Sequence, residues 1–284
     1  ELQGLMGAHY ARQSGESEQV ARAIGEHYQP RFAGDTIPQS DAGRIVSLAD
    51  RIDTLVGIFA AGLKPTGNKD PFALRRSALG LLRILLEGRL DLSLDHLINT
   101  AANALSEHIS VSDEAADEVR SFIIDRLKHH YTGQGFTTGL IQSALVSDWR
   151  TLPDLDRRLH AISDFMGREE ATSLAAANKR IGNILKKSES SVSRNIETDR
   201  FIFEEEKRLF NEIVNVESNV EPLFLSGEYE AYLSRLASLR EPVDAYFDEV
   251  MVMDEDLDIR ANRLALLARL KGLFDRVADL AVLG

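Results

Sequence analysis

Apolar residues recur at intervals of three and four along most of this chain. The two clearest runs are Ile45, Leu48, Ala49, Ile52, Leu55, Val56 and Phe59, and Leu74, Ala78, Leu81, Leu82, Leu85 and Leu86. This spacing places apolar side chains on one face of an α-helix. Similar patterns predict further helices over about 93–108, 113–131, 137–146, 154–166, 169–187, 199–218, 227–252 and 257–282. Runs of β-branched residues are few and no Asn-Gly or Asp-Gly hairpin is present, so the sequence predicts an all-α fold.

Two interruptions divide this helical pattern. Thr151-Leu152-Pro153-Asp154 combines turn residues with a helix-start signal. The serine-rich segment Ser188–Asn195 reads as a polar loop between two long helices. No fixed-period repeat is found, which argues against a solenoid. We therefore expect two domains, over residues 1–153 and 154–284.

The loop over residues 62–76 is the most constrained stretch of the chain. It contains two Gly and two Pro, and it carries Lys64 and Lys69. Asp70-Pro71 then predicts a helix start, with Asp70 as the N-cap residue and Pro71 in the first helical position. Arg75 and Arg76 would follow within two turns. A basic loop at a helix start could hold a phosphate, but with no P-loop or dinucleotide fingerprint the spacing favours a capped loop with solvated cations.

A second group of cations occupies residues 178–187. It comprises Lys179, Arg180, Lys186 and Lys187. Lys179, Asn183, Lys186 and Lys187 are expected on or near one face of a helix, whereas Ile181, Ile184 and Leu185 are expected on the other. Such a face could contact a nucleic-acid backbone. It could equally be a solvated helix end whose lysines complement the helix dipole.

Charge and composition narrow the possible partners. The net charge is −12, but residues 201–284 alone carry 18 acidic and 9 basic side chains. Any nucleic-acid contact must therefore come from local patches. No run of 18 apolar residues is present to span a membrane. The absence of cysteine excludes disulfides and thiolate chemistry and suits a cytoplasmic protein, while the first residues are typical of the interior of a longer protein.

No arrangement of polar residues predicts a catalytic centre or a metal site. The seven histidines include the adjacent pair His129 and His130, whose side chains would point about 100° apart on a helix. Asp50 and Asp53 share one helix face and could ligate a metal, but pairing with Arg51 or another nearby cation is the simpler interpretation. No nucleophile elbow or zinc-protease motif appears.

Several separated motifs resemble the β subunit of bacterial tetrameric glycyl-tRNA synthetase. The most specific covers residues 64–76. Others cover residues 1–7, 27–34, 48–57, 177–187, 242–253 and 260–267. The resemblance extends from the first residue of the chain to the last.

The resemblance implies a fold, a function and partners. Residues 1–153 would form an N-terminally truncated HD-like helical domain with a helical connector, and residues 154–284 an all-helical anticodon-binding domain. The chain would bind tRNA(Gly) while the α subunit, the other expected partner, carries out aminoacylation with ATP and Mg. It would hold no cofactor itself, and would bind neither DNA nor a membrane. An HD-type metal phosphohydrolase is the disfavoured alternative, because the chain has no His-Asp pair, and a purely structural adaptor ranks third.

The resemblance also suggests roles for particular residues. The expected tRNA-binding residues are Lys64, Lys69, Arg75, Arg76, Lys179, Arg180, Lys186 and Lys187. Glycine anticodons carry two cytosines, whose amino groups are natural donors to Asp or Glu, so an acidic surface could read them. Unstacked bases also require aromatic platforms, for which Tyr229, Tyr232, Tyr246 and Phe247 are candidates.

Overall fold

The computed structural model describes residues 2–188 and 195–283. In these residues the regular structure is helical, apart from one isolated backbone bridge between Thr66 and Lys69. The all-α prediction is therefore confirmed. The chain separates into two compact units, the first formed by Glu1–Gly135 and Arg150–Pro153 and the second by Phe136–Trp149 and Asp154–Gly284.

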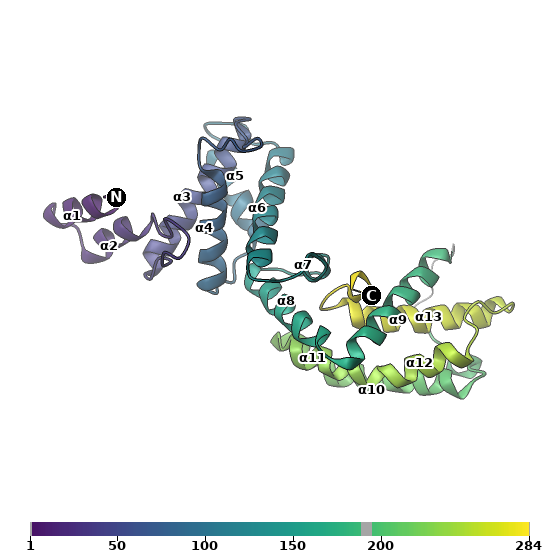
Figure 1. The fold of residues 1–284 in the computed structure, drawn as a ribbon. Helices are drawn as coiled ribbons and strands as arrows, with labels where there is room; N and C mark the ends of the chain where they lie inside the picture. The colour runs from purple at the N-terminus through teal and green to yellow at the C-terminus, as the bar shows by residue number, and fades with distance from the viewer. Residues whose placement is uncertain (1, 189–194, 284) are drawn as a thin grey trace. The chain divides into compact units, whose positions relative to one another are not determined.

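Unit 1 is built around one long helix, α3. Its helices are α1 (Leu5–Gln13), α2 (Glu18–Glu26), α3 (Asp41–Ala60), α4 (Leu74–Glu87), α5 (Leu94–Leu105) and α6 (Asp113–Gly133). Helix α3 packs against α2, α4, α5 and α6, while α1 and α2 form a hairpin (Figure 1). The core includes fully buried Leu55, Leu81 and Ile123. Ile45 and Ala49 belong to the predicted apolar face of α3, but both are exposed, so that face is only partly buried.

Unit 2 is a second helical assembly. It contains α7 (Thr138–Leu145), α9 (Glu169–Lys187), η1 (Thr198–Arg200), α10 (Glu204–Ser226), α11 (Tyr229–Leu236), η2 (Ala237–Leu239), α12 (Arg240–Glu249), α13 (Leu257–Asp275), η3 (Leu280–Val282) and most of α8 (Leu152–Met166). Helix α10 packs against α11, α12 and α13, and α9 packs against α12 and α13 (Figure 1). This arrangement leaves one face of α9 exposed.

A buried ion pair fixes the start of α10. Glu206 and Arg263 are 0% and 1% exposed, and the Arg263 Nε lies 2.8 Å from Glu206 Oε1. The other carboxylate oxygen of Glu206 accepts hydrogen bonds from the backbone amides of Ile202 and Phe203, at 2.8 and 2.9 Å. These bonds satisfy amides that precede the helix, where no carbonyl of the same helix is available. Helix α10 therefore begins at Glu204. The apolar pattern had predicted a start near residue 199.

Three other predicted boundaries differ from the structure. Helix α10 continues through Pro222 to Ser226 and ends at Gly227, which adopts the left-handed conformation favoured by glycine (φ 76°). The predicted helix over 227–252 is divided into α11, η2 and α12, and Pro242 lies in the first turn of α12, where no amide donor is needed. The last long helix ends at Asp275 instead of continuing to 282.

Two remaining expectations concern a loop and the membrane. Of the predicted loop Ser188–Asn195, residues 189–194 lie outside the described residues. Within the described ranges, every helix is too short or too polar to cross a membrane.

Candidate functional site

The first predicted site, the loop before α4, is capped differently from the expectation. Helix α4 begins at Leu74, and its N-cap residue is Ala73 in the left-handed conformation (φ 55°), so Pro71 is not in the first helical position. Asp70 still caps the helix, because its carboxylate accepts hydrogen bonds from the amides of Leu74 and Arg75 at 2.8 and 3.0 Å. These helix-end amides are already bound, so they do not offer the phosphate site that the sequence left open.

The four cations near this loop point to different neighbours. Lys64 forms an ion pair with Glu118 of α6. Arg75 donates a hydrogen bond to the carbonyl of Gly67 at 2.6 Å and braces the loop. Lys69 is exposed and has no ion pair with a described residue. Arg76 lines a separate pocket, so the structure does not gather the predicted group into one patch.

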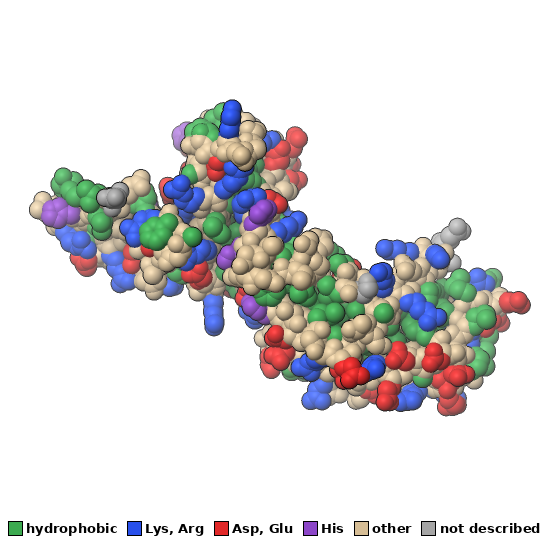
Figure 2. All heavy atoms as spheres, in the orientation of Figure 1, with side chains coloured by type: hydrophobic (Ala, Val, Ile, Leu, Met, Phe, Trp, Pro, Cys, Tyr) green, Lys and Arg blue, Asp and Glu red, His purple; other side chains and the backbone are tan. Residues whose placement is uncertain are grey.

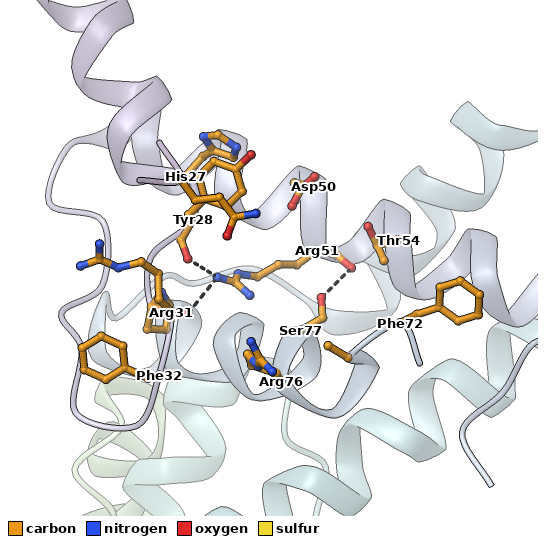
Figure 3. Close-up of a pocket in the computed structure, with 13 residues that line it drawn as sticks. His27, Tyr28, Arg31, Phe32, Asp50, Arg51, Thr54, Phe72, Arg76 and Ser77 are labelled. Carbon is orange, nitrogen blue, oxygen red and sulfur yellow. Dashed lines mark hydrogen bonds between the residues drawn. The ribbon is translucent and has the colours of Figure 1, made fainter. Parts of the chain in front are cut away.

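That pocket is a concave feature of unit 1. It has a volume of about 610 Å³ and lies among the segment after α2, α3 and the start of α4 (Figure 3). Its charged side chains are Arg31, Arg51, Arg76 and Asp50. Arg31 is paired with Asp35 at 2.9 Å, so Arg51 and Arg76 outweigh Asp50 by one charge. The lining is therefore cationic, which suits an anionic ligand better than a cation.

Arg51 is the most constrained of these arginines. Its side chain is 9% exposed, and its Nη2 donates hydrogen bonds to the carbonyls of Tyr28, Gln29 and Pro30 at 3.0–3.1 Å. Gly80 of α4 lies against the guanidinium, where a side chain would collide with it. Burial lowers the pKa of Arg51, although the nearby charge of Asp50 opposes this effect. The structure thus holds a buried positive charge against carbonyl groups.

The acidic and histidine residues do not assemble a metal site. Among the described residues, no group of three or more His, Asp or Glu side chains could hold a metal ion. Asp50 lines the pocket together with three arginines, and the exposed Asp53 does not line it. His27 instead packs against Tyr28, with ring centroids 3.9 Å apart. A divalent cation needs several oxygen or nitrogen ligands, so these surroundings do not fit the metal of an HD-type phosphohydrolase.

The second predicted site is an exposed face of α9. Leu174, Asn178 and Ile181 are buried against the rest of unit 2, whereas the four basic residues of the helix are exposed. These residues are Lys179, Arg180, Lys186 and Lys187. In Figure 2, basic side chains lie around the C-terminal end of α9, while acidic ones gather along the edge formed by α10 and α12. Unit 2 therefore combines a local cationic surface with an acidic one.

A shallow groove of about 410 Å³ runs along this face of α9. It is lined by Ala176, Lys179, Arg180, Asn183, Ile184 and Lys187. Ile184 was expected on the opposite, apolar face, but it lies with the cations because it is four residues after Arg180. The Arg180 guanidinium stacks over the ring of Phe247 at 4.1 Å from the ring centroid. The groove thus brings cations, an apolar side chain and a half-buried aromatic ring together.

Three of the four predicted aromatic platforms belong to the core. Tyr229, Tyr232 and Tyr246 are 5%, 0% and 0% exposed, so the proposal that they stack on bases is wrong. Burial raises the pKa of both Tyr232 and Tyr246. Tyr232 donates a hydrogen bond to the carbonyl of Leu273 at 2.7 Å. Only Phe247 of the four is still available to a ligand at its edge.

Sequence reasoning missed the pocket around Arg51. One signal was present: position 51 follows Leu48 by three residues and precedes Leu55 by four, so it falls on the apolar face of its helix. An arginine at such a position must be buried with partners, and it marks a polar site within the fold.

The sequence patterns of two known families match this chain. The pattern described as "Glycyl-tRNA synthetase beta subunit" matches residues 1–146, and the "DALR anticodon binding domain" pattern matches residues 174–281. The first match covers unit 1 except Arg150–Pro153, together with all of α7, and the second covers most of unit 2, including the cationic face of α9.

Curated relatives are similar over the whole chain. The "Glycine--tRNA ligase beta subunit" proteins of Acinetobacter baumannii, Photorhabdus laumondii and Pseudomonas aeruginosa are each 45% identical to it over 283 or 284 residues. The match includes 100% of this chain and 41% of each relative. The chain therefore spans well under half the length of the proteins that it resembles.

Proposed function

Because this chain belongs to the glycyl-tRNA synthetase β-subunit family, we propose that it is the tRNA-binding portion of a glycine–tRNA ligase. In this role it positions tRNA(Gly) for aminoacylation and contributes no catalytic group. The observation that carries the proposal is the exposed cationic face of α9, which lies in the segment matched by an anticodon-binding family.

The chemistry of unit 2 suits an anticodon loop. Lys179, Arg180, Lys186 and Lys187 would bind backbone phosphates and fix the register of the RNA. The Arg180–Phe247 stack offers a flat surface for an unpaired base, because bases pack on aromatic rings and on guanidinium planes. Neighbouring carboxylates would accept hydrogen bonds from cytosine amino groups. Phosphate contacts would thus supply affinity, and the acidic surface would supply preference for cytosine.

The catalytic partner in this proposal is the α subunit of the same ligase. That subunit would bind ATP, Mg and glycine, while this chain would need no cofactor of its own. Aminoacylation serves translation, so we place the complex in the cytoplasm. In unit 1, Lys64, Lys69, Arg75 and Arg76 would contact tRNA phosphates or brace neighbouring domains.

Charge reversal on α9 tests the proposal. Replacing Lys179 and Lys186 together by Glu should weaken binding of tRNA(Gly) and make it less dependent on salt. Each lost phosphate contact lowers the slope of log K against log[salt] by about 0.7–0.9. The measurement is a titration of labelled tRNA(Gly) at several salt concentrations.

A matched control has the same charge change away from this face. Lys207→Glu with Arg208→Glu alters two exposed cations on α10, which pair with Glu204 and Glu241. The control should change the salt slope less than the α9 variant does. Equal slopes for the two variants would refute the α9 contact.

A second experiment tests base reading. The chain is titrated with tRNA(Gly) in which either anticodon cytosine is replaced by uracil. Weaker binding of the substituted tRNA is expected, because a carboxylate then faces an acceptor in place of a donor. Equal affinities would remove the base-reading part of the proposal.

A further inference from the structure

Of the residues that line the pocket around Arg51 in unit 1, only Arg76 has a role in the proposed function, as a contact of tRNA phosphates or a brace between domains. We propose that it binds one nucleoside phosphate, with the phosphate against Arg76 and Arg51 and the base against the ring of Phe72. The ligand is either an unpaired nucleotide of an RNA strand or a free mononucleotide. The inference rests on the proposed function only where RNA is the source.

The size and lining of the pocket fit such a ligand. Its volume of about 610 Å³ is within the range of roughly 300–1,000 Å³ that is usual for small-molecule sites. Three arginines and one carboxylate line it, and because Arg31 is paired with Asp35, Arg51 and Arg76 outweigh Asp50 by one charge, in a chain whose net charge is −12. The pocket lining is therefore positively charged although the whole chain is negatively charged, and this lining favours an anionic ligand.

Arg51 supplies a fixed charge at the pocket wall. Three carbonyls hold its Nη2, and Ser47 Oγ lies 3.2 Å from its Nε, so the side chain is already oriented. No carboxylate is hydrogen-bonded to it among the residues that the structure describes. A buried cation without such a counter-ion is stabilised when a bound anion approaches.

Arg76 and Phe72 are the groups still available to a ligand. The guanidinium of Arg76 forms no hydrogen bond or ion pair with a described residue, whereas the neighbouring Arg75 is tied to Gly67. The ring of Phe72 is 44% exposed and has no aromatic or cationic partner in the described part of the chain. Phe32, on the other side of Arg51 in Figure 3, is already near Arg31, at 5.9 Å. Phe72 is therefore the ring that a base would cover.

The remaining polar groups complete a nucleotide site. Asp50, Thr54 and Ser77 line the pocket and can bind ribose hydroxyls or base amino groups. The carboxylate of Asp50 would repel the phosphate, so the phosphate is expected on the Arg76 side. The two arginines would thus bind the phosphate, the polar side chains of the lining the ribose, and the ring of Phe72 the base.

The test measures binding of defined probes to the protein. AMP, inorganic phosphate, a single-stranded adenosine pentanucleotide and an RNA duplex of equal length are titrated by calorimetry. The variants are Arg76→Gln and Phe72→Leu, both at exposed positions. The controls are Lys128→Gln, an exposed cation of α6 outside the pocket, and Tyr10→Leu, another exposed aromatic.

Each result decides the inference. AMP or the pentanucleotide should bind, and both pocket variants should weaken that binding by about tenfold or more, while the controls change it little. Tighter binding of the pentanucleotide than of AMP identifies an RNA strand as the source, and equal binding identifies a free mononucleotide. Binding that neither pocket variant alters would overturn the inference, and so would no binding at millimolar concentration. If only Arg76→Gln weakens binding, and inorganic phosphate binds as tightly as AMP, the pocket is an anion site and the nucleotide proposal is refuted.

The same preparation separates this inference from the proposed function. If neither AMP nor the pentanucleotide binds, while binding of tRNA(Gly) responds to charge reversal on α9, the proposed function is kept and the inference is removed. Binding of AMP without any binding of tRNA(Gly) does the reverse.

Discussion

Removing the carboxylate of Glu206 should be among the most damaging single changes in unit 2. Loss of one partner of a buried ion pair costs about 3–5 kcal/mol, and Arg263 keeps a second carboxylate, Asp254 at 2.7 Å, so the lower end of that range applies. The amides of Ile202 and Phe203 also lose their acceptor, which adds about 1 kcal/mol. We therefore expect Glu206→Ala to lower the free energy of unfolding by about 4 kcal/mol. Whole domains are stable by only about 5–15 kcal/mol.

Urea unfolding measures this loss. The single tryptophan, Trp149, lies in unit 2, so its fluorescence reports on that unit, while circular dichroism follows both units. Glu206→Gln keeps an acceptor for the amides and should cost less than the alanine variant. Glu204→Ala, in the same turn, removes only an exposed pair and should change stability by less than about 1 kcal/mol. Equal losses for Glu206→Ala and Glu204→Ala would refute the role of the buried pair.

Three further changes test unit 1. Gly80→Ala should destabilise it by about 1–3 kcal/mol in a thermal melt, because the new Cβ would lie 2.5 Å from the Arg51 guanidinium. As a control, Gly133→Ala should be neutral or stabilising in the same melt, because nothing lies within 4 Å of its new Cβ. The Arg31 guanidinium holds the pKa of Asp35 at about 2, so this pair stabilises the fold above the ordinary pKa of 3.8 and the contribution is lost as pH falls through about 2. The unfolding free energies of wild type and Asp35→Asn should therefore converge on acidification, and a constant difference would contradict this assignment. Asp70→Ala should cost about 1 kcal/mol through the lost helix cap, and Asp70→Asn should recover part of it; equal loss in both would argue against capping.

The helical class and most helix positions could be predicted because they depend on local periodicity. The runs over 74–86, 113–131 and 169–187 match α4, α6 and α9 within a few residues. The hairpin of α1 and α2 was absent from the predicted stretches. Several predicted helix boundaries were wrong because a contact or backbone conformation that the periodicity does not show determines them. The carboxylate of Glu206 determines the start of α10, and Ala73 in the left-handed conformation places the start of α4 at Leu74.

The candidate site was harder to predict than the fold, because it depends on which residues are buried together. The sequence placed Lys179, Lys186 and Lys187 on or near one face of α9, since this depends on helical spacing alone. It did not show that Phe247 lies under Arg180, 67 positions earlier in the chain, or that three tyrosines are core residues. The sequence does show that Arg51 is a charged residue on an apolar helix face. It does not show its partners in the segment after α2, because these contacts join two different elements of the fold.

The most direct test of the central claim is a titration of this chain with tRNA(Gly), set against a tRNA whose anticodon lacks both cytosines. The account predicts tight, salt-dependent binding of tRNA(Gly), weaker binding of the second tRNA, and a smaller salt slope after charge reversal of Lys179 and Lys186. Absence of binding to tRNA(Gly) at low salt would contradict it.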